Sequence, residues 1–296
     1  MMATEIPSEN SKEIKKAAEV LKKLKPAYST IIAFYEKIFE AQEKSAVKIK
    51  VHVSPILEDI LSIKVREQFP LISPSEFSVD INESRKLFKK ICEIITKSES
   101  SMSSNAEAIF KASENKSLNI NELYKALLND DNVSFGDIAL KFKTSKDALA
   151  FIVYNSIEPS VSLYAQSVSK YLAKYNPWEK GYCPVCGSLP VISIFGADGE
   201  RFLFCSFCRH KWISTRLFCP FCENKDSGTL HYFFSEEEKE YRVYVCDKCG
   251  KYIKNIDSRI VDRFVYPPLE HVATLHLDIM AKEKGFESGA PLGFQI

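Results

Sequence analysis

Eight cysteines with one repeated spacing are the residues of this chain best suited to chemistry. They form four C-x-x-C pairs: Cys183 and Cys186, Cys205 and Cys208, Cys219 and Cys222, Cys246 and Cys249. Two residues between thiols allow a tight turn that directs both sulfurs at one ion. Four thiolates complete the tetrahedral shell of a structural zinc or iron site. The sequence therefore predicts two tetrathiolate-bound metal ions and leaves open whether they are iron or zinc.

Disulfides are the alternative use of paired cysteines. The first residues, Met-Met-Ala-Thr-Glu-Ile-Pro, lack the apolar stretch of a secretory signal. Paired thiols in a chain without such a signal are far more often metal ligands than structural disulfides. Cys92 stands apart from the pairs, at the edge of an apolar helical face, and is interpreted as a small buried hydrophobe.

The segments between the pairs indicate which pairs share an ion. Alternating residues flank Ala197-Asp198-Gly199, which is typical of a hairpin between the first two pairs. A second hairpin, around the acidic turn 235–240, lies between the last two pairs. Sequential pairing, with one hairpin inside each site, explains both segments, and cross-braced pairing is the alternative.

The residue after each pair bears on the geometry of the turn. Gly187 and Gly250 follow their pairs and tolerate a left-handed backbone, while Arg209 and Glu223 hold the equivalent places. All four ligand places of each site are filled by sulfur, whereas a catalytic zinc keeps one place for water. We therefore expect no hydrolysis at either metal and no enzyme activity, and no Gly-rich phosphate loop or H-E-x-x-H motif argues otherwise.

The elements that carry these pairs follow a helical region. Apolar residues recur at helical spacing over residues 10–175, with Asp80 and Glu83 as a predicted helix cap. Two helices, 148–157 and 161–175, are expected to be separated near Pro159. Short alternating strands begin at Asn176-Pro177. A closing helix then follows, its apolar face formed by Leu269, Val272, Leu275, Ile279 and Met280, and Gly285 can end it.

These patterns predict an α+β fold. An all-helical N-terminal domain is followed by two rubredoxin-like or zinc-ribbon-like metal modules and a C-terminal helix. The expected domains are residues 1–176, 177–218 and 219–296. No apolar run approaches the roughly 20 residues of a membrane-spanning helix.

Charge argues against a general attraction to nucleic acid. The formal net charge is only +1, and bound thiolates would make it negative. One basic group is the exception: Arg201, Arg209, His210, Lys211 and Arg216. We interpret this group first as surface that balances the anionic thiolate centre and second as a docking patch.

The cysteine motifs and their flanks resemble the FdhE family of formate dehydrogenase accessory proteins. The resemblance rests on Tyr182-Cys-Pro-Val-Cys-Gly-Ser-Leu-Pro190, Cys205-x-x-Cys-x-x-x-Trp212, Cys219-Pro-x-Cys222, Cys246-Asp-x-Cys-Gly-Lys-Tyr-Ile-Lys254 and Val272-Ala-Thr-Leu-x-Leu-Asp278. In the helical half it is looser and rests on residues such as Phe69-Pro70-Leu71.

This resemblance implies a cytoplasmic factor needed to mature respiratory formate dehydrogenase. It further implies that the eight cysteines form a rubredoxin-like, iron-binding region that contacts the catalytic subunit of that enzyme. The sequence does not predict an oligomeric state. Arg209 and Glu223 depart from the small residues common in such knuckles, and Glu270-His271 stands where an acidic pair is expected.

Two other functions fit the same motifs. A nucleic-acid-binding zinc ribbon would need exposed aromatics beside basic residues, for which Phe207, Trp212, Phe218 and Phe221 are candidates. Packing over small metal sites explains these aromatics equally well. A rubredoxin-like electron carrier would instead require redox-active iron.

Overall fold

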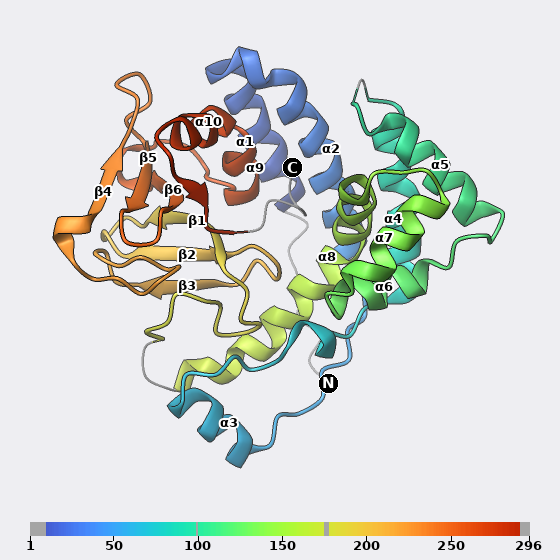
Figure 1. Cartoon of the computed structure of the whole chain (residues 1–296), viewed down its shortest axis with the longest axis horizontal. Coiled ribbons are helices and arrows are strands. Elements are labelled where there is room, and N and C mark those ends of the chain that lie inside the picture. Colours follow the sequence, from blue (N-terminus) through green and yellow to red (C-terminus); the bar gives the residue numbers. More distant parts are fainter. Residues whose placement is uncertain (1–9, 99, 175–177, 291–296) are drawn as a thin grey trace. The chain divides into compact units, whose positions relative to one another are not determined.

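The computed structural model describes residues 10–98, 100–174 and 178–290, and Figure 1 labels their helices and strands. Two compact units divide these residues. The first takes residues up to His52 and Pro74–Leu163, and the second takes Val53–Ser73 and the chain from Tyr164. The predicted change from helical to alternating apolar spacing, at Asn176-Pro177, lies outside the described residues. The first seven residues of the chain lie outside them as well. The three-domain division by motif stays a prediction.

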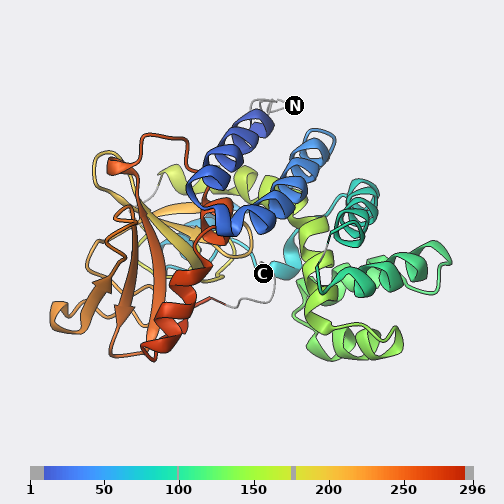
Figure 2. The ribbon, with the colours of Figure 1, turned by 90° about the horizontal axis from the view of Figure 1, so that it is seen from above.

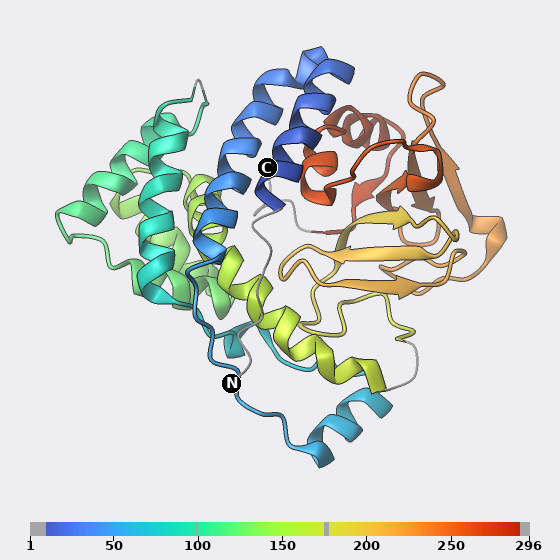
Figure 3. The ribbon, with the colours of Figure 1, turned by 180° about the vertical axis from the view of Figure 1, so that it is seen from behind.

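The first unit is helical, as the periodicity predicts. Its helices are α1 Asn10–Leu24, α2 Ser29–Ala46, α4 Ile81–Thr96, α5 Ser103–Glu114, α6 Ile120–Leu128, α7 Asn132–Lys141 and the first part of α8 Lys146–Ser169. Pro26 opens a short 3₁₀ turn before α2, which suits its fixed φ and missing N–H. The pair α1 and α2 lies side by side (Figure 3).

The predicted cap and the isolated cysteine both lie on α4. The Asp80 carboxylate accepts a hydrogen bond from the Glu83 backbone N–H at 3.1 Å, which confirms the cap. Phe88, Ile91 and Cys92 are fully buried on the same helix. Burial raises the pKa of the Cys92 thiol to about 12, so this thiol is inert packing, as expected.

The predicted break at Pro159 is wrong. α8 runs unbroken from Lys146 to Ser169 with Pro159 inside it, and a 3₁₀ turn, Lys170–Lys174, follows. Proline removes the N–H that would bond to the carbonyl of Asn155, one helical turn earlier. The buried Gln42 side chain replaces it, since its Nε2 donates to the Asn155 backbone oxygen at 2.9 Å. A tertiary contact thus satisfies the carbonyl that the local rule leaves unpaired.

The second unit holds one seven-stranded sheet (Figure 1). Its strands are β1 Pro190–Phe195, β2 Arg201–Cys205, β3 Lys211–Ser214, β4 Leu230–Phe233, β5 Tyr241–Cys246, β6 Lys251–Asp257 and β7 Glu287–Ser288. Both predicted hairpins, β1–β2 and β4–β5, are present and antiparallel. The sequence patterns did not predict β3, β6 or β7.

Parallel pairing of β1 with β6 joins the two metal modules. Ile192 lies opposite Lys254 and Ile194 opposite Ile256 in this ladder. The strand order is β3-β2-β1-β6-β5-β4, with β7 beside β6. The first module therefore contributes three strands and the second four to a common sheet, and neither has a separate core.

Two short helices, α9 Pro267–Val272 and α10 Leu275–Glu283, close the chain where one was predicted. Ile279 is 60% exposed, so the predicted apolar face is also wrong at that position. The break at Ala273 and Thr274 rotates α10, so that Leu277 and Ala281 pack on the strands instead. Figure 2 shows α10, in red, along this face of the sheet. Gly285 follows α10 at φ 84°, as expected for a helix end.

None of the described helices has the length and apolarity needed to span a membrane.

Candidate metal centres

All four C-x-x-C turns share one backbone conformation. The residue after each second cysteine has positive φ: Gly187 78°, Arg209 56°, Glu223 59° and Gly250 67°. The N–H of this residue bonds back to the first cysteine carbonyl in three of the turns, at 2.9, 2.9 and 2.8 Å. The expectation for the two glycines is confirmed, and Arg209 and Glu223 adopt the same conformation despite their side chains. We call these four turns knuckles 1 to 4 in chain order.

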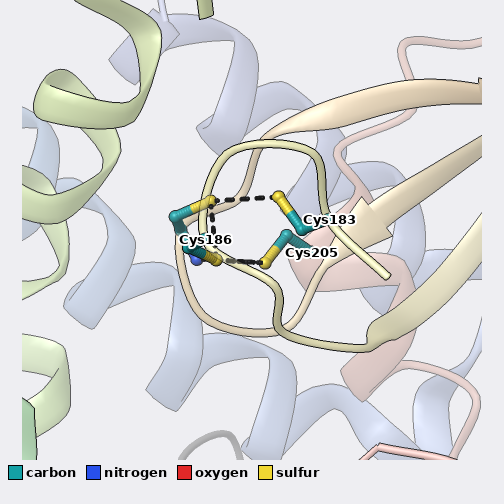
Figure 4. A group of neighbouring side chains, drawn as sticks. Cys183, Cys186 and Cys205 are labelled. Atoms are coloured by element: carbon teal, nitrogen blue, oxygen red, sulfur yellow. Dashed lines mark hydrogen bonds between the residues drawn. The ribbon is translucent and has the colours of Figure 1, made fainter. Parts of the chain in front are cut away.

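The sulfurs of knuckles 1 and 2 form the first group. Cys186 Sγ lies 3.5 Å from both Cys205 Sγ and Cys208 Sγ, and Cys183 Sγ lies 3.6 Å from Cys208 Sγ. Figure 4 shows the labelled side chains converging on one point. All four residues are buried. Backbone N–H groups of Phe207 and Cys208 donate to Cys205 Sγ at 3.4 Å, as they would to a thiolate.

The sulfurs of knuckles 3 and 4 form the second group. Cys219 Sγ lies 3.7 Å from Cys249 Sγ, and Cys222 Sγ lies 3.7 Å from Cys246 Sγ. Cys222 and Cys249 are only partly buried, so this group is closer to solvent than the first. Asn224 holds the edge of the group, because its Nδ2 donates to Cys246 Sγ at 3.5 Å and to Thr229 Oγ1 at 2.7 Å.

The spacing of the sulfurs fits a tetrahedral ion. Metal–sulfur bonds near 2.3 Å place the corners of a tetrahedron about 3.8 Å apart, close to the observed separations. A disulfide needs about 2.05 Å, so no bond joins these sulfurs. The ligand atoms within each group all lie within 4.8 Å of one another. The eight predicted ligands therefore meet in sequential pairs that could hold two metal ions, and the cross-braced alternative is wrong.

The electrostatics of both groups favour a bound cation. Burial raises the pKa of the Cys183 and Cys208 thiols well above its usual value. The pKa of Cys186 is lowered by hydrogen bonds from the neighbouring thiols. Burial opposes ionisation of Cys246, but the Asn224 amide and nearby backbone N–H groups bring its pKa to about 7. Thiolates buried together are costly without compensating positive charge, which a divalent ion supplies.

A segment from far upstream supports knuckle 1 from within the same unit. It follows α3, Glu58–Arg66. Leu71 N–H donates to the Pro184 carbonyl and Ile72 N–H to the Val185 carbonyl, both at 2.9 Å. Tyr182 Oη donates to the Gln68 carbonyl at 2.7 Å. The spacing of the cysteines could not predict this contact. The one available sequence signal was Phe69-Pro70-Leu71, which is part of the resemblance to FdhE in the helical half.

Close backbone approach ties the two modules together. A Cβ on Gly181 would lie 1.9 Å from the Pro220 carbonyl oxygen in knuckle 3. Only glycine fits there. Lys180 pairs with Glu223 across the same contact at 3.1 Å, although both are too exposed for the pair to contribute much stability.

The predicted basic group is not a continuous surface. Arg201 is only 1% exposed, which corrects its assignment to surface. Its Nη1 donates to the Phe218 carbonyl at 2.8 Å. Arg201 shares the buried face of β2 with Leu203 and Cys205. Its two-residue spacing from Leu203 and from the ligand Cys205 was the sequence signal for that face. Burial also lowers the pKa of His210 to about 4 and so removes its charge near neutral pH.

The candidate stacking aromatics are largely covered. Phe207, Trp212 and Phe218 have exposures of 7%, 5% and 4%. Phe207 lies within knuckle 2, Phe218 directly precedes knuckle 3 and Trp212 lies on β3, and none of them presents a ring face to solvent. Phe221 is partly buried. These positions therefore support the packing interpretation and offer little to a nucleic-acid base.

Sequence comparisons find a likeness of this chain to one family. The family model of the FdhE central domain matches residues 182–216. An FdhE homolog of Aquifex aeolicus is 38% identical over 146 residues, which are 48% of this chain and 50% of that protein. FdhE of Escherichia coli is 32% identical over 112 residues, which are 36% of this chain and 35% of that protein. The match thus spans half or less of the length of these relatives.

The fold extends the likeness beyond the matched sequence. The crystal structure of FdhE from Pseudomonas aeruginosa superposes with a TM-score of 0.66 at 18% identity, covering 96% of this chain and 95% of that chain. This likeness concerns the fold alone. Together with the sequence matches, it confirms the predicted resemblance to the FdhE family.

Proposed function

We propose that this chain is a cytoplasmic accessory factor for the assembly of respiratory formate dehydrogenase. In this proposal it is not an enzyme, and it docks on the catalytic subunit of formate dehydrogenase through its tetrathiolate region. The observation that carries the proposal is the pair of four-sulfur groups in a chain whose residues 182–216, which hold the first group, match the FdhE central domain. An accessory role for formate dehydrogenase is what the family resemblance supports.

The ligand sets support binding rather than turnover. The eight cysteines would hold two ions, and each ion would supply a structural cross-link between two knuckles. Four sulfurs leave no ligand place for a substrate, so neither group is suited to metal-assisted hydrolysis. The residues themselves then act by fixing the shape of the knuckles and of the sheet strands that enter them.

The second group is the better candidate for contact with a partner. Cys222 and Cys249 are only partly buried, whereas all four cysteines of the first group are buried. Asp247 and Lys248, between the cysteines of knuckle 4, are exposed. A partner could therefore contact knuckle 4 directly, while the first group serves mainly to hold the sheet.

A rubredoxin-like electron carrier is the second candidate. It is favoured by the two N–H groups that donate to Cys205 Sγ, because such bonds tune the potential of thiolate-bound iron. Absorption spectra of anaerobically purified protein, before and after reduction, separate the functions. A reversible ferric–ferrous change would favour the carrier, and colourless zinc-loaded protein that still supports assembly would exclude it.

The assembly role is tested by complementation in cells that lack their own factor. Wild-type chain should restore formate-dependent activity, while the double replacement Cys219→Ser and Cys222→Ser should not. Cys92→Ala is the control, since it removes a cysteine outside both groups. Restoration by the double variant as complete as by wild type would contradict the proposal. Purified wild-type chain should itself oxidise no formate.

A further inference from the structure

A groove of about 540 Å³ lies between α2 and α4 on the surface of the first unit. The two helices pack on each other. The Lys50 backbone N–H donates to the carboxylate of Asp80 at 3.0 Å. This bond joins the segment after α2 to the cap of α4, so the two helices run antiparallel. Nothing in the assembly proposal uses this groove.

The walls of the groove are rich in lysine. Six exposed lysines line it, three from each side: Lys37, Lys44, Lys48, Lys86, Lys90 and Lys97. Within each set of three, neighbours are four or seven residues apart, which keeps the side chains on one face of a helix. Only three glutamates line the groove with them, so positive charge is in excess.

Half of these lysines already have a carboxylate partner. Lys44, Lys86 and Lys90 each pair with a glutamate of their own helix, at 3.7, 2.6 and 3.0 Å. Exposed pairs of this kind contribute little to stability. The other three lysines have no ion pair among residues 10–98, 100–174 and 178–290. Their charge is therefore available to a ligand.

The three unpaired lysines lie at both ends of the groove. Because the helices are antiparallel, Lys48 lies at the end where α4 begins, and Lys37 and Lys97 lie at the end where α4 finishes. Residues 37–48 span about 16 Å along a helix axis, or three helical turns. The unpaired charge is thus spread over the length of a short helix, which a single small anion cannot reach at both ends.

The floor between the lysines is apolar. Leu87 is 3% exposed, and Ala41 and Ile94 are half-buried beside it. The described residues that line the groove include no aromatic ring and no arginine. Nucleic acids use such rings for stacking, and arginine for planar contacts to phosphate. An apolar floor between two rows of lysine instead matches a helix that buries apolar side chains and carries carboxylates on both flanks.

We propose that this groove docks an acidic amphipathic helix of a partner protein. Apolar residues of that helix contact the floor, and its carboxylates pair with the unpaired lysines at both ends. The groove lies in the helical unit, outside the tetrathiolate region that the assembly proposal uses for docking. The two proposals can therefore fail independently.

Fluorescence anisotropy of a labelled synthetic peptide tests the groove, by titration with the metal-loaded full chain at an ionic strength of about 0.15 M. The peptide has about 15 residues, which cover the length of the groove as a helix. Leucines at i, i+3, i+4 and i+7 form its apolar face, and glutamates flank that face. A second peptide keeps this composition but scatters the leucines, and a third has lysine in place of glutamate. A labelled single-stranded oligonucleotide of about 15 nucleotides is the nucleic-acid probe.

Two variants of the chain locate the binding. One removes the unpaired charge of the groove: Lys37→Gln, Lys48→Gln and Lys97→Gln. Its matched control removes the same charge from exposed lysines outside the groove: Lys15→Gln, Lys16→Gln and Lys125→Gln. All six positions are exposed, so both variants should fold, and far-UV circular dichroism checks that they do.

The acidic amphipathic peptide should bind with 1:1 stoichiometry, about tenfold more tightly than either of the other peptides. The groove variant should weaken this binding about tenfold, and the control variant less than about twofold, since each exposed ion pair contributes modestly. No saturable binding by wild type, an equal loss in the control variant, or equal binding of the peptide with scattered leucines would overturn the proposal.

Two further outcomes would assign the groove to another occupant. Tighter binding of the oligonucleotide than of the acidic peptide would overturn the proposal in favour of a nucleic acid. Sedimentation of the chain alone tests for a second copy. Self-association that the groove variant abolishes and the control variant keeps would overturn the proposal in favour of that copy.

Discussion

Replacing Gln42 by methionine should destabilise the helical unit through a residue far along the chain. Gln42 is 2% exposed and donates to the Asn155 backbone oxygen at 2.9 Å and to Asn155 Oδ1 at 3.1 Å. Methionine has a similar volume but no donor. Pro159 supplies no N–H to the same carbonyl, so the variant leaves buried oxygens unpaired. With about 1–3 kcal/mol for each such group, we expect a loss of ~2–4 kcal/mol.

A second replacement isolates the cause. Pro159→Ala restores an N–H that can bond to the Asn155 carbonyl within α8. Gln42→Met in this background should therefore cost less than in the wild type, by about 1 kcal/mol or more. Gln166→Met is the control for exchanging a glutamine amide for methionine, because Gln166 is an exposed glutamine in the part of α8 that belongs to the second unit. It should change stability by less than about 0.5 kcal/mol.

Urea unfolding of the full chain, followed by far-UV circular dichroism, measures all four variants and the wild type. The helical transition reports the free energy of unfolding of the first unit. An equal cost of Gln42→Met with and without Pro159 would refute the reasoning, because the carbonyl would then not be what Gln42 satisfies. A negligible cost in the wild-type background would refute it as well.

Three further predictions concern a knuckle, a cap and the metals. Gly250→Ala should lower the free energy of unfolding by about 1 kcal/mol and speed metal loss to a chelator. A Cβ at this position meets no neighbouring atom, so the cost comes from the positive φ alone. Gly136 lies inside α7 with the same free space around a Cβ but no positive φ, so Gly136→Ala should raise the free energy of unfolding by ~0.5–1 kcal/mol. Denaturant unfolding in which Gly250→Ala stabilises the protein and Gly136→Ala destabilises it would contradict this prediction. Asp80→Ala should cost ~1 kcal/mol at neutral pH. Partial burial opposes the negative charge of Asp80, but backbone N–H groups hold its pKa below the usual value. The difference in stability between wild type and Asp80→Ala should therefore fade as acid protonates the carboxylate. A difference that does not change with pH would contradict the assignment of Asp80 as a cap. Chelation should open residues 178–260 to proteolysis while helical dichroism persists, since a structural site contributes roughly 10–16 kcal/mol in model peptides, and protection unchanged by chelation would contradict this.

Local patterns were sufficient to predict which cysteines lie together. The C-x-x-C spacing and the two hairpin signals are short-range features, and each hairpin joins the two knuckles of one group. Glycine at positions 187 and 250 indicated the left-handed turn directly. The ligand groups could thus be derived from the order of the chain, without knowledge of the sheet.

Non-local contacts set the limit of the sequence prediction. The parallel pairing of β1 with β6 has no turn signal, because the paired strands are separated by most of both modules. Pro159 breaks a helix by the local rule, and only the distant Gln42 explains why α8 continues. Composition predicts Arg201 to be a surface cation, but it is buried on β2 and donates to the carbonyl of Phe218, 17 residues later in the chain. In each case the deciding partner lies far away in the sequence.

The central claim is tested most directly by anaerobic co-purification from cells that produce formate dehydrogenase, with metal analysis of the captured material. Tagged wild-type chain should retain the catalytic subunit and about two metal ions per chain, and Cys92→Ala should behave alike. The double variant Cys219→Ser and Cys222→Ser should lose the subunit while keeping the ion of the first group. Retention of the catalytic subunit by the double variant at the wild-type level, with the second ion gone, would contradict the account.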